Sequence, residues 1–536
     1  MASVVTVNDL LDGHVSLEVE CLDRVYLNGY VPNLQVAGQV VTFMTKHLGF
    51  PIPSPAIMEK IGTRFRRAVT AFAEGNGIPI IRFGKGDRKV EVMGRYLRAQ
   101  AKTGQSAVVA VGVAQEYQNV FASSERQSPS GVPSFGFHKA DRRVTCFYFY
   151  LWDTDFGPAF IKVCAYFPYP VKVWVNGHEW AKRQATKAGI GFTALSNGFA
   201  TCEDPAALQA ICDRLGPGTI NVFFERWMSR LPLPLDETDR AGGYWWELSM
   251  RQIEVSRTIV FDAPRRARAF FEALVVDNLD VGRPDSVELI FTGPHHTGRR
   301  PHLDCVPKTK VVTRDTEVTV NAFYKHSRIK QYLKDGRAMR IETVVNSPDD
   351  LRCHRRLEHL DELVAKARAV NARLLDTERV GQGCVLASPA FERVALPTLT
   401  ADGRRAPAIR FGDPRAMALL GALCVGLNAL GFTNRSLRAL VSHLLGAAYT
   451  TSQMSYDLAR LRLNGLIERL PHTNTYVLTP DGQRVAIFYT KVHDHLLRPL
   501  IAANAPPAPT ELRQALRTID RHIRDYADHA RLKTAA

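Results

Sequence analysis

The alternation of apolar and polar positions is clearest near the C-terminal end of the chain. Leucine and valine at helical spacing predict a helix that Thr433 and Asn434 can cap and that Gly446 can end. A second helix, two short strands and a further helix are predicted to follow, over residues 451–465, 467–470 and 476–478 and from 480 onward. This order of elements predicts a winged helix-turn-helix.

Polar side chains lie on the face of the second helix that we expect to be exposed, and at the tip of the strand pair. They are groups that reach base edges and phosphates when such a helix enters a major groove, namely Gln453, Tyr456, Arg460, Arg462, His472, Asn474 and Thr475. The same residues also suit a solvated helix in a protein–protein module, because winged helices can dimerise. The pattern alone leaves both interpretations open.

Apolar runs of strand length alternate with helical patterns through the first part of the chain. The runs cover residues 15–31, 78–83, 107–114, 144–152 and 159–167. The first run is predicted to turn at Asn28-Gly29, and the third to be a buried strand that ends at Gln115-Glu116. The last two predict a hairpin. We therefore expect an α/β fold with mixed sheets and interleaved helices.

Acidic side chains fall at turns and ends of these predicted elements: Asp23, Glu116, Asp155, Glu179 and Asp204. In a ribonuclease-H-like sheet, carboxylates from neighbouring strands and one helix hold one or two Mg²⁺ ions, which activate water at a phosphodiester. The order here permits such a magnesium site, with Asp23, Glu116 and Asp155 as ligands. Each carboxylate can equally form a turn, cap a helix or pair with a cation.

Three more strands are predicted between residues 318 and 345. Their alternation puts lysine and arginine on one face, a strip suited to a phosphate backbone: Lys325, Lys330, Lys334 and Arg340. Filamentous-phage replication initiators contain a similar KxYxK hairpin, which makes Tyr332 a candidate nucleophile. A solvent-facing sheet with cross-strand charge pairs is the alternative. His295, His296 and His302 only approximate a metal-binding pair, and we interpret them as loop residues.

Composition and charge favour a polyanionic partner. The 536 residues are too many for one core, and 69 Lys and Arg against 53 Asp and Glu give a formal charge of +16. The basic residues are dispersed, as in a long groove, and Arg64 and Arg67 lie on a predicted helix over residues 56–74. Nine cysteines without a CxxC pair, no secretory signal and no apolar stretch of bilayer length predict a cytoplasmic protein with no membrane partner.

These patterns predict a multidomain chain. The expected parts are an N-terminal α/β domain (1–105), a mixed α/β core with the acidic site (106–215), a helical and β-hairpin domain with the basic strip (216–380), a linker (381–414), the winged helix (415–500), and a hinge with a basic C-terminal helix (501–536).

Several stretches resemble the signatures of a widespread family of bacterial proteins that end in a winged helix and have features of mobile elements. The stretches are residues 20–28, 112–116, 148–157, 176–184, 330–343 and 431–435, so the resemblance spans nearly the whole chain. It implies no established activity.

We expect a nucleic-acid-binding protein of a mobile element or defence system, in which the α/β body holds or cuts DNA or RNA and the winged helix recognises the site. If the protein is an enzyme, we expect a metal-dependent nuclease that uses the five carboxylates. The alternatives are a non-enzymatic replication or regulatory protein and a replication initiator with Tyr332 as its nucleophile. A ribonucleoprotein partner and a dimer are both compatible with the sequence.

Overall fold

The computed structural model describes residues 11–493 except residue 85 and the ranges 127–133, 282–285, 291–307, 315–316, 381–388, 401 and 425–430. Beyond 493 it describes residues 510, 511, 514, 515, 517, 518, 521 and 522. The chain forms two compact units. The sheet unit comprises Asp12–Arg268 and His326–Asn371, and the C-terminal unit comprises Met1–Leu11, Ala269–Lys325 and Ala372–Ala536. The histidines predicted to lie in a loop, and the predicted hinge at 501–509, lie outside the described residues.

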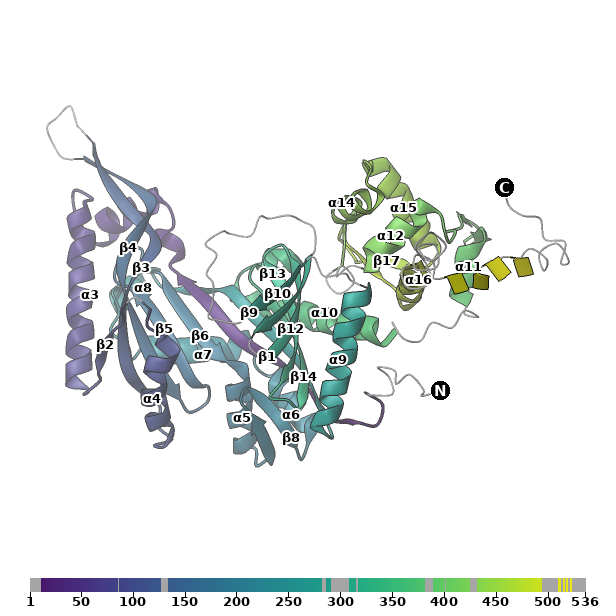
Figure 1. Ribbon diagram of the computed structural model, residues 1–536. Helices are drawn as coiled ribbons and strands as arrows, with labels where there is room; N and C mark the ends of the chain where they lie inside the picture. The colour runs from purple at the N-terminus through teal and green to yellow at the C-terminus, as the bar shows by residue number, and fades with distance from the viewer. Residues whose placement is uncertain are drawn as a thin grey trace. The chain divides into compact units, whose positions relative to one another are not determined.

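A large sheet forms the centre of the sheet unit (Figure 1). In spatial order, its strands in this unit are β13 (Ser327–Lys334), β14 (Ala338–Val345), β9 (Glu247–Phe261), β1 (Val15–Tyr30), β6 (Val171–Asn176), β5 (Gly157–Cys164), β4 (Ser134–Asp153), β3 (Ala107–Arg126) and β2 (Ile80–Arg82). Neighbours run antiparallel, except for the parallel pair β2 and β3. The mixed α/β class is confirmed. Segments on both sides of the predicted boundaries 105/106 and 215/216 contribute strands to this one sheet.

Strand β1 lies between β9 and β6 and does not turn at Asn28-Gly29, so the predicted hairpin over 15–31 is wrong. The glycine serves close packing instead, because a Cβ atom at Gly29 would lie 2.9 Å from the Cβ of Val171 on β6. β3 likewise runs past Glu116 to Arg126, so Glu116 lies within a strand and not at its end. The predicted hairpin of β4 and β5 is confirmed.

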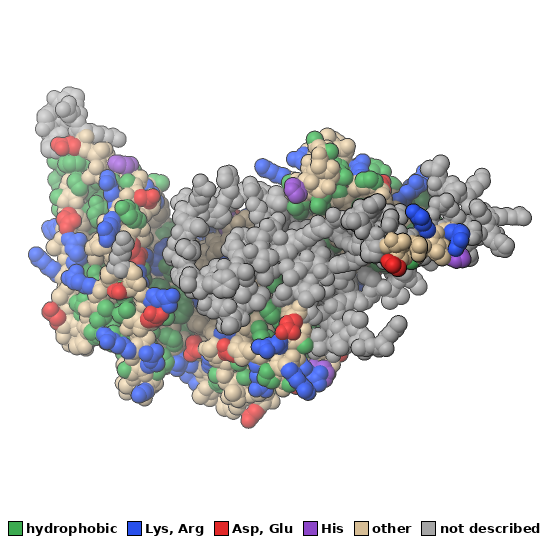
Figure 2. Space-filling view, viewed as in Figure 1, with side chains coloured by type: hydrophobic (Ala, Val, Ile, Leu, Met, Phe, Trp, Pro, Cys, Tyr) green, Lys and Arg blue, Asp and Glu red, His purple; other side chains and the backbone are tan. Residues whose placement is uncertain are grey.

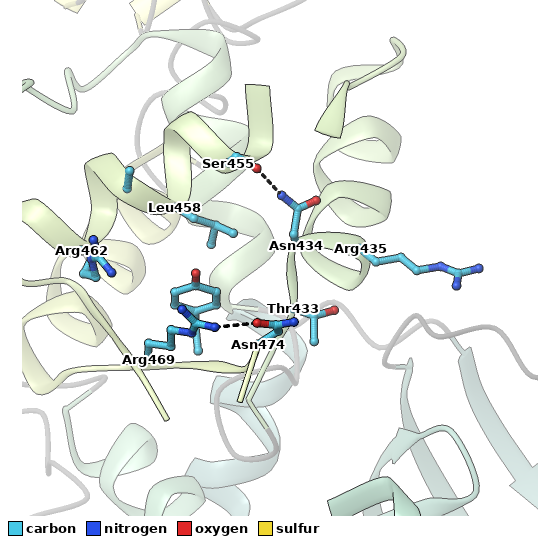
Figure 3. Close-up of a pocket in the computed structure, with 10 residues that line it drawn as sticks. Thr433, Asn434, Arg435, Ser455, Leu458, Arg462, Arg469 and Asn474 are labelled. Carbon is cyan, nitrogen blue, oxygen red and sulfur yellow. Dashed lines mark hydrogen bonds between the residues drawn. The ribbon is translucent and has the colours of Figure 1, made fainter. Parts of the chain in front are cut away.

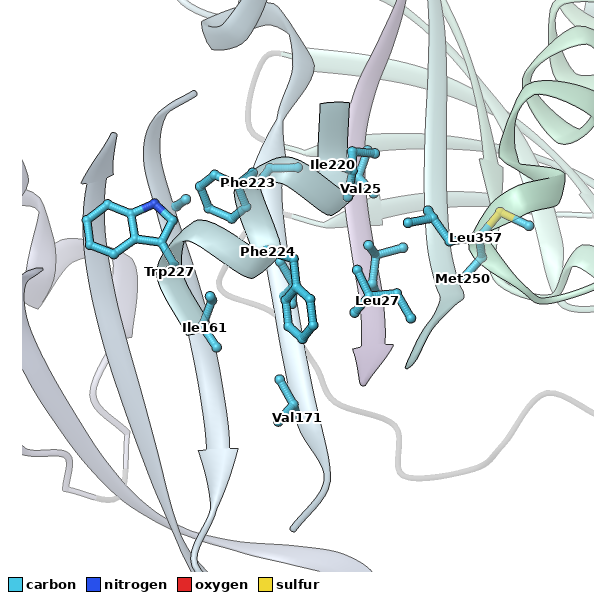
Figure 4. Close-up of a cluster of buried hydrophobic side chains, with 14 of the residues drawn as sticks. Val25, Leu27, Ile161, Val171, Ile220, Phe223, Phe224, Trp227, Met250 and Leu357 are labelled. Atoms are coloured by element: carbon cyan, nitrogen blue, oxygen red, sulfur yellow. The ribbon is translucent and has the colours of Figure 1, made fainter. Parts of the chain in front are cut away.

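One face of this sheet is covered by α7 (Pro217–Met228) and α3 (Pro55–Gly75). Ile220, Phe223, Phe224 and Trp227 of α7 project toward apolar side chains of β1, β5, β6 and β9 (Figure 4). On α3, Phe65 packs edge-on against Phe147 of β4, with ring centroids 5.5 Å apart. These apolar positions alternate along each strand, so the main hydrophobic core lies on this face.

The opposite face is covered at one end by α4 (Lys89–Ala101), whose buried Met93 packs with Ala110 of β3 and with Cys146 and Tyr148 of β4. Near the other end, β1 contacts α5 (Gly177–Lys187), α6 (Pro205–Asp213) and β8 (Gly198–Cys202), which pairs with β7 (Phe192–Leu195). The middle of this face, on β1, β6 and β5, carries half-buried side chains.

In the C-terminal unit, α12 (Pro414–Cys424), α14 (Asn434–Leu445), α15 (Thr451–Leu463) and α16 (Pro480–Lys491) pack around one core, beside the antiparallel pair β17 (Ile467–Arg469) and β18 (Tyr476–Leu478). Thr433 caps α14, and Gly446 ends it in the left-handed region with φ +64°, as the sequence predicts. Thr450 caps α15, which starts at Thr451 as the sequence predicts. The same unit contains β10 (Ser286–Ile290), β11 (Lys308–Arg314) and β12 (Glu317–Tyr324).

The segment predicted as a linker, 381–414, is structured where it is described. It contains α11 (Pro389–Ala395) and the strand pair β15 (Thr398–Leu399) and β16 (Arg405–Ala406), and Ala390, Val394 and Ile409 are buried in the core of the C-terminal unit. Two further helices are α9 (Pro264–Val281) and α10 (Leu360–Val380) (Figure 1). Within the described ranges, no helix is both long enough and apolar enough to cross a bilayer.

Candidate functional site

The five carboxylates predicted as a catalytic set do not come together. Asp155 lies in the turn after β4 and pairs with Lys187 and with Arg226, whose Nη1 is 2.9 Å from its Oδ2. Glu179 lies in the first turn of α5 with its Oε1 2.9 Å from the Nζ of Lys182. Asp204 caps α6, where its Oδ1 accepts from the backbone amide of Ala207 at 2.9 Å. These are the structural roles that the sequence left open for them.

Glu116 lies on the face of β3 that α4 covers, among cations rather than other acids. Its carboxylate accepts hydrogen bonds from Lys162 at 2.8 Å, from Lys89 at 2.5 Å and from the Tyr148 hydroxyl at 2.5 Å. Burial by itself would raise the pKa of Glu116, but these hydrogen bonds outweigh it and lower the pKa to about 2. Glu116 is therefore an ionised anchor for two lysines.

Asp23 lies in a different acidic cluster, with Glu254 of β9 and Glu342 of β14. Among the residues that the structure describes, these three form the one group whose potential metal-ligand atoms all lie within 4.8 Å of one another. Asp23 reaches them because a β-bulge interrupts the pairing of β1 with β9 between Leu22 and Arg24. All three carboxylates are almost completely buried.

Each carboxylate of this cluster already has a cation. Arg340 Nη1 lies 3.4 Å from Asp23, Lys330 Nζ lies 2.9 Å from Glu342, and Arg24 Nη1 lies 3.5 Å from Glu254. The distances among the carboxylates would suit a metal ion, but three negative and three positive groups are already balanced. The residues present therefore build a charge-neutral network more readily than a magnesium site.

His178 and Asn197 complete the network around Asp23. The Asn197 side chain donates to Asp23 at 2.7 Å, and Nε2 of His178 lies 3.1 Å from the Ser256 hydroxyl. Burial and the nearby Arg340 lower the pKa of His178 well below its usual value, so the imidazole is neutral at pH 7. A neutral ring adds no charge to the balance.

Tyr332 of β13 stands opposite Arg340 of β14 and is half-buried. Burial and the nearby Glu342 raise the pKa of its hydroxyl, which opposes formation of the phenolate that a nucleophile requires. The structure thus brings two predicted catalytic residues, Asp23 and Tyr332, next to Arg340, but in surroundings that favour a protonated tyrosine.

The predicted basic strip does not form as expected. Arg340 is completely buried and donates to Asn197, Thr258 and Asp23, so it cannot reach a phosphate backbone. Lys330 is tied to Glu342. Lys334 is half-buried with its Nζ 3.7 Å from Asp335, and Lys325 is exposed.

Arg64 and Arg67 are exposed on α3, as predicted, and Arg64 lies 3.7 Å from Asp236. Figure 2 shows lysine and arginine side chains scattered over the visible part of the sheet unit that carries α3 and α4, with acidic side chains between them. The positive charge is thus dispersed here as well as in the sequence.

A groove of about 430 Å³ lies in the C-terminal unit, and we call it the arginine groove. It is lined by the start of α14, by one face of α15 and by β17 and β18 (Figure 3). Its polar side chains are Thr433, Asn434, Arg435, Ser455, Arg462, Arg469 and Asn474. Two hydrogen bonds brace it, from Asn434 to Ser455 at 3.0 Å and from Arg469 to Asn474 at 2.6 Å (Figure 3).

None of the three arginines of this groove forms an ion pair within the described part of the chain. Arg469 donates only to the Thr473 carbonyl and the Asn474 amide, and Arg435 extends outward from the start of α14 (Figure 3). Arg462 lies one turn beyond Ala459 on the groove face of α15. Three unpaired guanidinium groups beside a helix N-terminus attract anions.

Of the seven residues predicted to contact bases or phosphates, Arg462 and Asn474 line this groove. Gln453 instead closes the capping box of α15, with its side chain accepting from the Thr450 amide at 2.8 Å. Arg460 is buried against the Ala408 carbonyl and Asp457, contrary to the prediction that it is exposed. Tyr456 and His472 are exposed but do not line the groove.

Comparison with known proteins adds nothing to these observations: no family model, curated protein or solved structure matches the chain.

Proposed function

We propose that the chain is a nucleic-acid-binding protein and that residues 414–491 form a winged helix that recognises duplex DNA or RNA through the arginine groove. The observation that carries this proposal is the set of three arginines, Arg435, Arg462 and Arg469, that line one groove and have no acidic partner among the described residues. The formal charge of +16 agrees with a polyanionic partner.

The groove combines two kinds of contact that protein–nucleic acid interfaces need. The guanidinium groups and the N-terminus of α14 suit phosphate oxygens, which set position but not sequence. Asn434, Ser455 and Asn474 offer amide and hydroxyl groups of the kind that read base edges. The mobile-element or defence context rests on the resemblance noted for the sequence.

The proposal is tested by measuring the affinity for duplex DNA and duplex RNA at several salt concentrations. Replacing Arg435, Arg462 and Arg469 together by alanine should weaken binding about tenfold or more. The same change should reduce the dependence of binding on salt by roughly one unit of slope for each phosphate that an arginine no longer neutralises.

A matched control removes the same charge elsewhere in the C-terminal unit. Arg393, Arg404 and Arg484 each pair with an aspartate, so their triple alanine variant should bind almost as the natural protein does. Equal weakening of both variants would mean that net charge alone is responsible, and no weakening of either would contradict the proposal.

Phosphodiester cleavage has weaker support. A ribonuclease-H-like site needs carboxylates that converge, and four of the five predicted ones lie apart from the cluster around Asp23. The raised pKa of Tyr332 likewise gives no support to a tyrosine nucleophile. The non-enzymatic binder is therefore the form of the proposal that the geometry favours.

A further inference from the structure

A row of side chains crosses the middle of the open sheet face. Direct cross-strand partners are Gln252 of β9 with Tyr26 of β1, Tyr26 with Trp174 of β6, Trp174 with Phe160 of β5, and Phe160 with Tyr150 of β4. Because direct partners point to the same side of a sheet, four aromatic rings follow one another across four strands. We call Tyr26, Trp174 and Phe160 the aromatic row.

These three rings are half-buried, whereas Tyr150 is buried under α4. The Trp174 and Phe160 rings are nearly parallel, with an angle of 8° between them and centroids 5.9 Å apart, and Tyr26 meets Phe160 edge-on at 6.2 Å. Large aromatic side chains on a sheet are ordinarily covered by a further layer. This part of the face has no covering helix in the described part of the sheet unit comparable to α7 or α4.

Positive charge surrounds the aromatic row. Two residues farther along the strands, Lys172 of β6 is opposite Lys162 of β5, and the Arg251 guanidinium lies 5.3 Å from the Tyr26 ring centroid. Lys89 joins the same group through Glu116. Four cations thus lie at this end of the face, and two of them, Lys89 and Lys162, pair with Glu116.

Lys172 is the clearest case of a cation without an acidic partner among the described residues. Its ammonium group is bound to the Asn28 side-chain oxygen, and neither Lys172 nor Arg251 has an acidic partner among the described residues. Burial, followed by Arg251 and Lys162, lowers the pKa of Lys172 to about 7. A charged, half-buried lysine with cationic neighbours costs free energy unless an anion binds beside it.

We propose that single-stranded nucleic acid binds across β1, β6 and β5, with bases stacked on the aromatic row and phosphates held by Lys172 and Arg251. A row of aromatic rings on a sheet suits unpaired bases, because the π-faces of paired bases are hidden inside a duplex. The neighbouring cations select a polyanion over a neutral protein segment. This inference rests on the proposed function but assigns a second site, separate from the arginine groove.

The test is equilibrium binding of a fluorescent single-stranded oligothymidylate and an oligouridylate of the same length. In the full-length protein, the variant Tyr26→Leu/Trp174→Leu should lose about tenfold or more in affinity for single strands. Duplex binding should stay unchanged. The matched control is Trp245→Leu, which removes a half-buried tryptophan outside the row.

A second variant, Lys172→Met/Arg251→Ala, keeps the rings and removes the unpaired charges, so it tests the site even if the aromatic variant fails to fold. It should weaken single-strand binding and flatten its salt dependence. Binding of duplex but not of single strands by the natural protein would overturn this inference and leave the proposed function standing. Failure to bind either would overturn both. Single-strand binding that survives both variants in folded protein would also overturn it.

Discussion

At the scale of single residues, the most consequential feature is that Arg340 is buried. It is completely enclosed and donates to Asp23, Thr258 and the Asn197 carbonyl, so it stabilises a buried carboxylate cluster and does not contact solvent. Burying a cation in this position costs free energy. Removing it should cost more, because the Asp23 carboxylate would then be buried without its cation.

Removal of this cation should therefore destabilise the protein. We expect Arg340→Met to lower the free energy of unfolding by about 3–5 kcal/mol, and the double variant Asp23→Asn/Arg340→Met to lose clearly less. Urea denaturation measures both. Arg355→Met is the control, since its ion pair with Asp349 is exposed and should contribute about 0–1 kcal/mol. Equal losses in the single and double variants would show that Asp23 and Arg340 are not coupled.

Lys172 leads to a pH prediction, because its pKa of about 7 lies within the accessible range. The groups that act on it are Arg251 on β9, Lys162 on β5, Cys146 on β4 and Glu116 on β3. The lysine loses its proton as pH rises through 7, so we expect single-strand affinity to fall by roughly threefold to tenfold between pH 6 and pH 8.

The variant Lys172→Arg separates this effect from general titration. An arginine stays charged throughout the range, so its binding curves at pH 6 and pH 8 should nearly coincide. Fluorescence anisotropy at constant ionic strength measures the affinities. A natural protein with no pH dependence would mean that Lys172 does not contact the bound strand.

At the scale of elements, the junction of β6, α5 and the bulge of β1 sets the geometry around Asp23. A Cβ atom on Gly177, the first residue of α5, would lie 1.6 Å from the Leu22 carbonyl oxygen. Only a glycine lets the helix start this close to the bulge. The contact holds His178 beside Asp23, with Nε2 3.8 Å from the carboxylate.

The variant Gly177→Ala should therefore be strongly destabilised, by about 1–3 kcal/mol or more, because the helix and the bulge must move apart. The matched change Gly38→Ala, in α2 (Ala37–Thr42), meets no atom within 4 Å and should be neutral or gain up to about 1 kcal/mol. Thermal unfolding followed by circular dichroism compares them. Similar melting temperatures for the two variants would show that the approach at Gly177 is not tight.

At the scale of the whole molecule, the two proposals place different ligands on different units. The arginine groove belongs to the C-terminal unit, and the aromatic row belongs to the sheet unit. A protein with both sites would bind a duplex and an unpaired strand at once. Such a combination suits a chain that acts where duplex and single strand meet.

Simultaneous binding is the corresponding prediction. Saturating unlabelled duplex should leave the affinity for a labelled single strand within about threefold, because the sites share no residues. Analytical ultracentrifugation with two differently coloured oligonucleotides should detect both on one protein. Mutual displacement of the two ligands would show that they compete for one site and would contradict the assignment of two.

The sequence by itself determined the local elements. Caps, glycines and apolar spacing placed α14, α15, β17 and β18 within a residue or two, since these signals act between near neighbours in the chain. Alternation likewise predicted the strand pairs β4–β5 and β13–β14.

Only the tertiary structure decided which distant residues meet. Asp23, Glu254 and Glu342 come from strands far apart in sequence, and the bulge that turns Asp23 toward them has no local signature. The same holds for Tyr26, which joins Trp174 and Phe160 in the aromatic row only because β1 is inserted between β6 and β9. Strand order in a sheet depends on long-range pairing, and burial follows from that order, so neither the enclosure of Arg340 nor the open face beside it could be predicted from the chain alone.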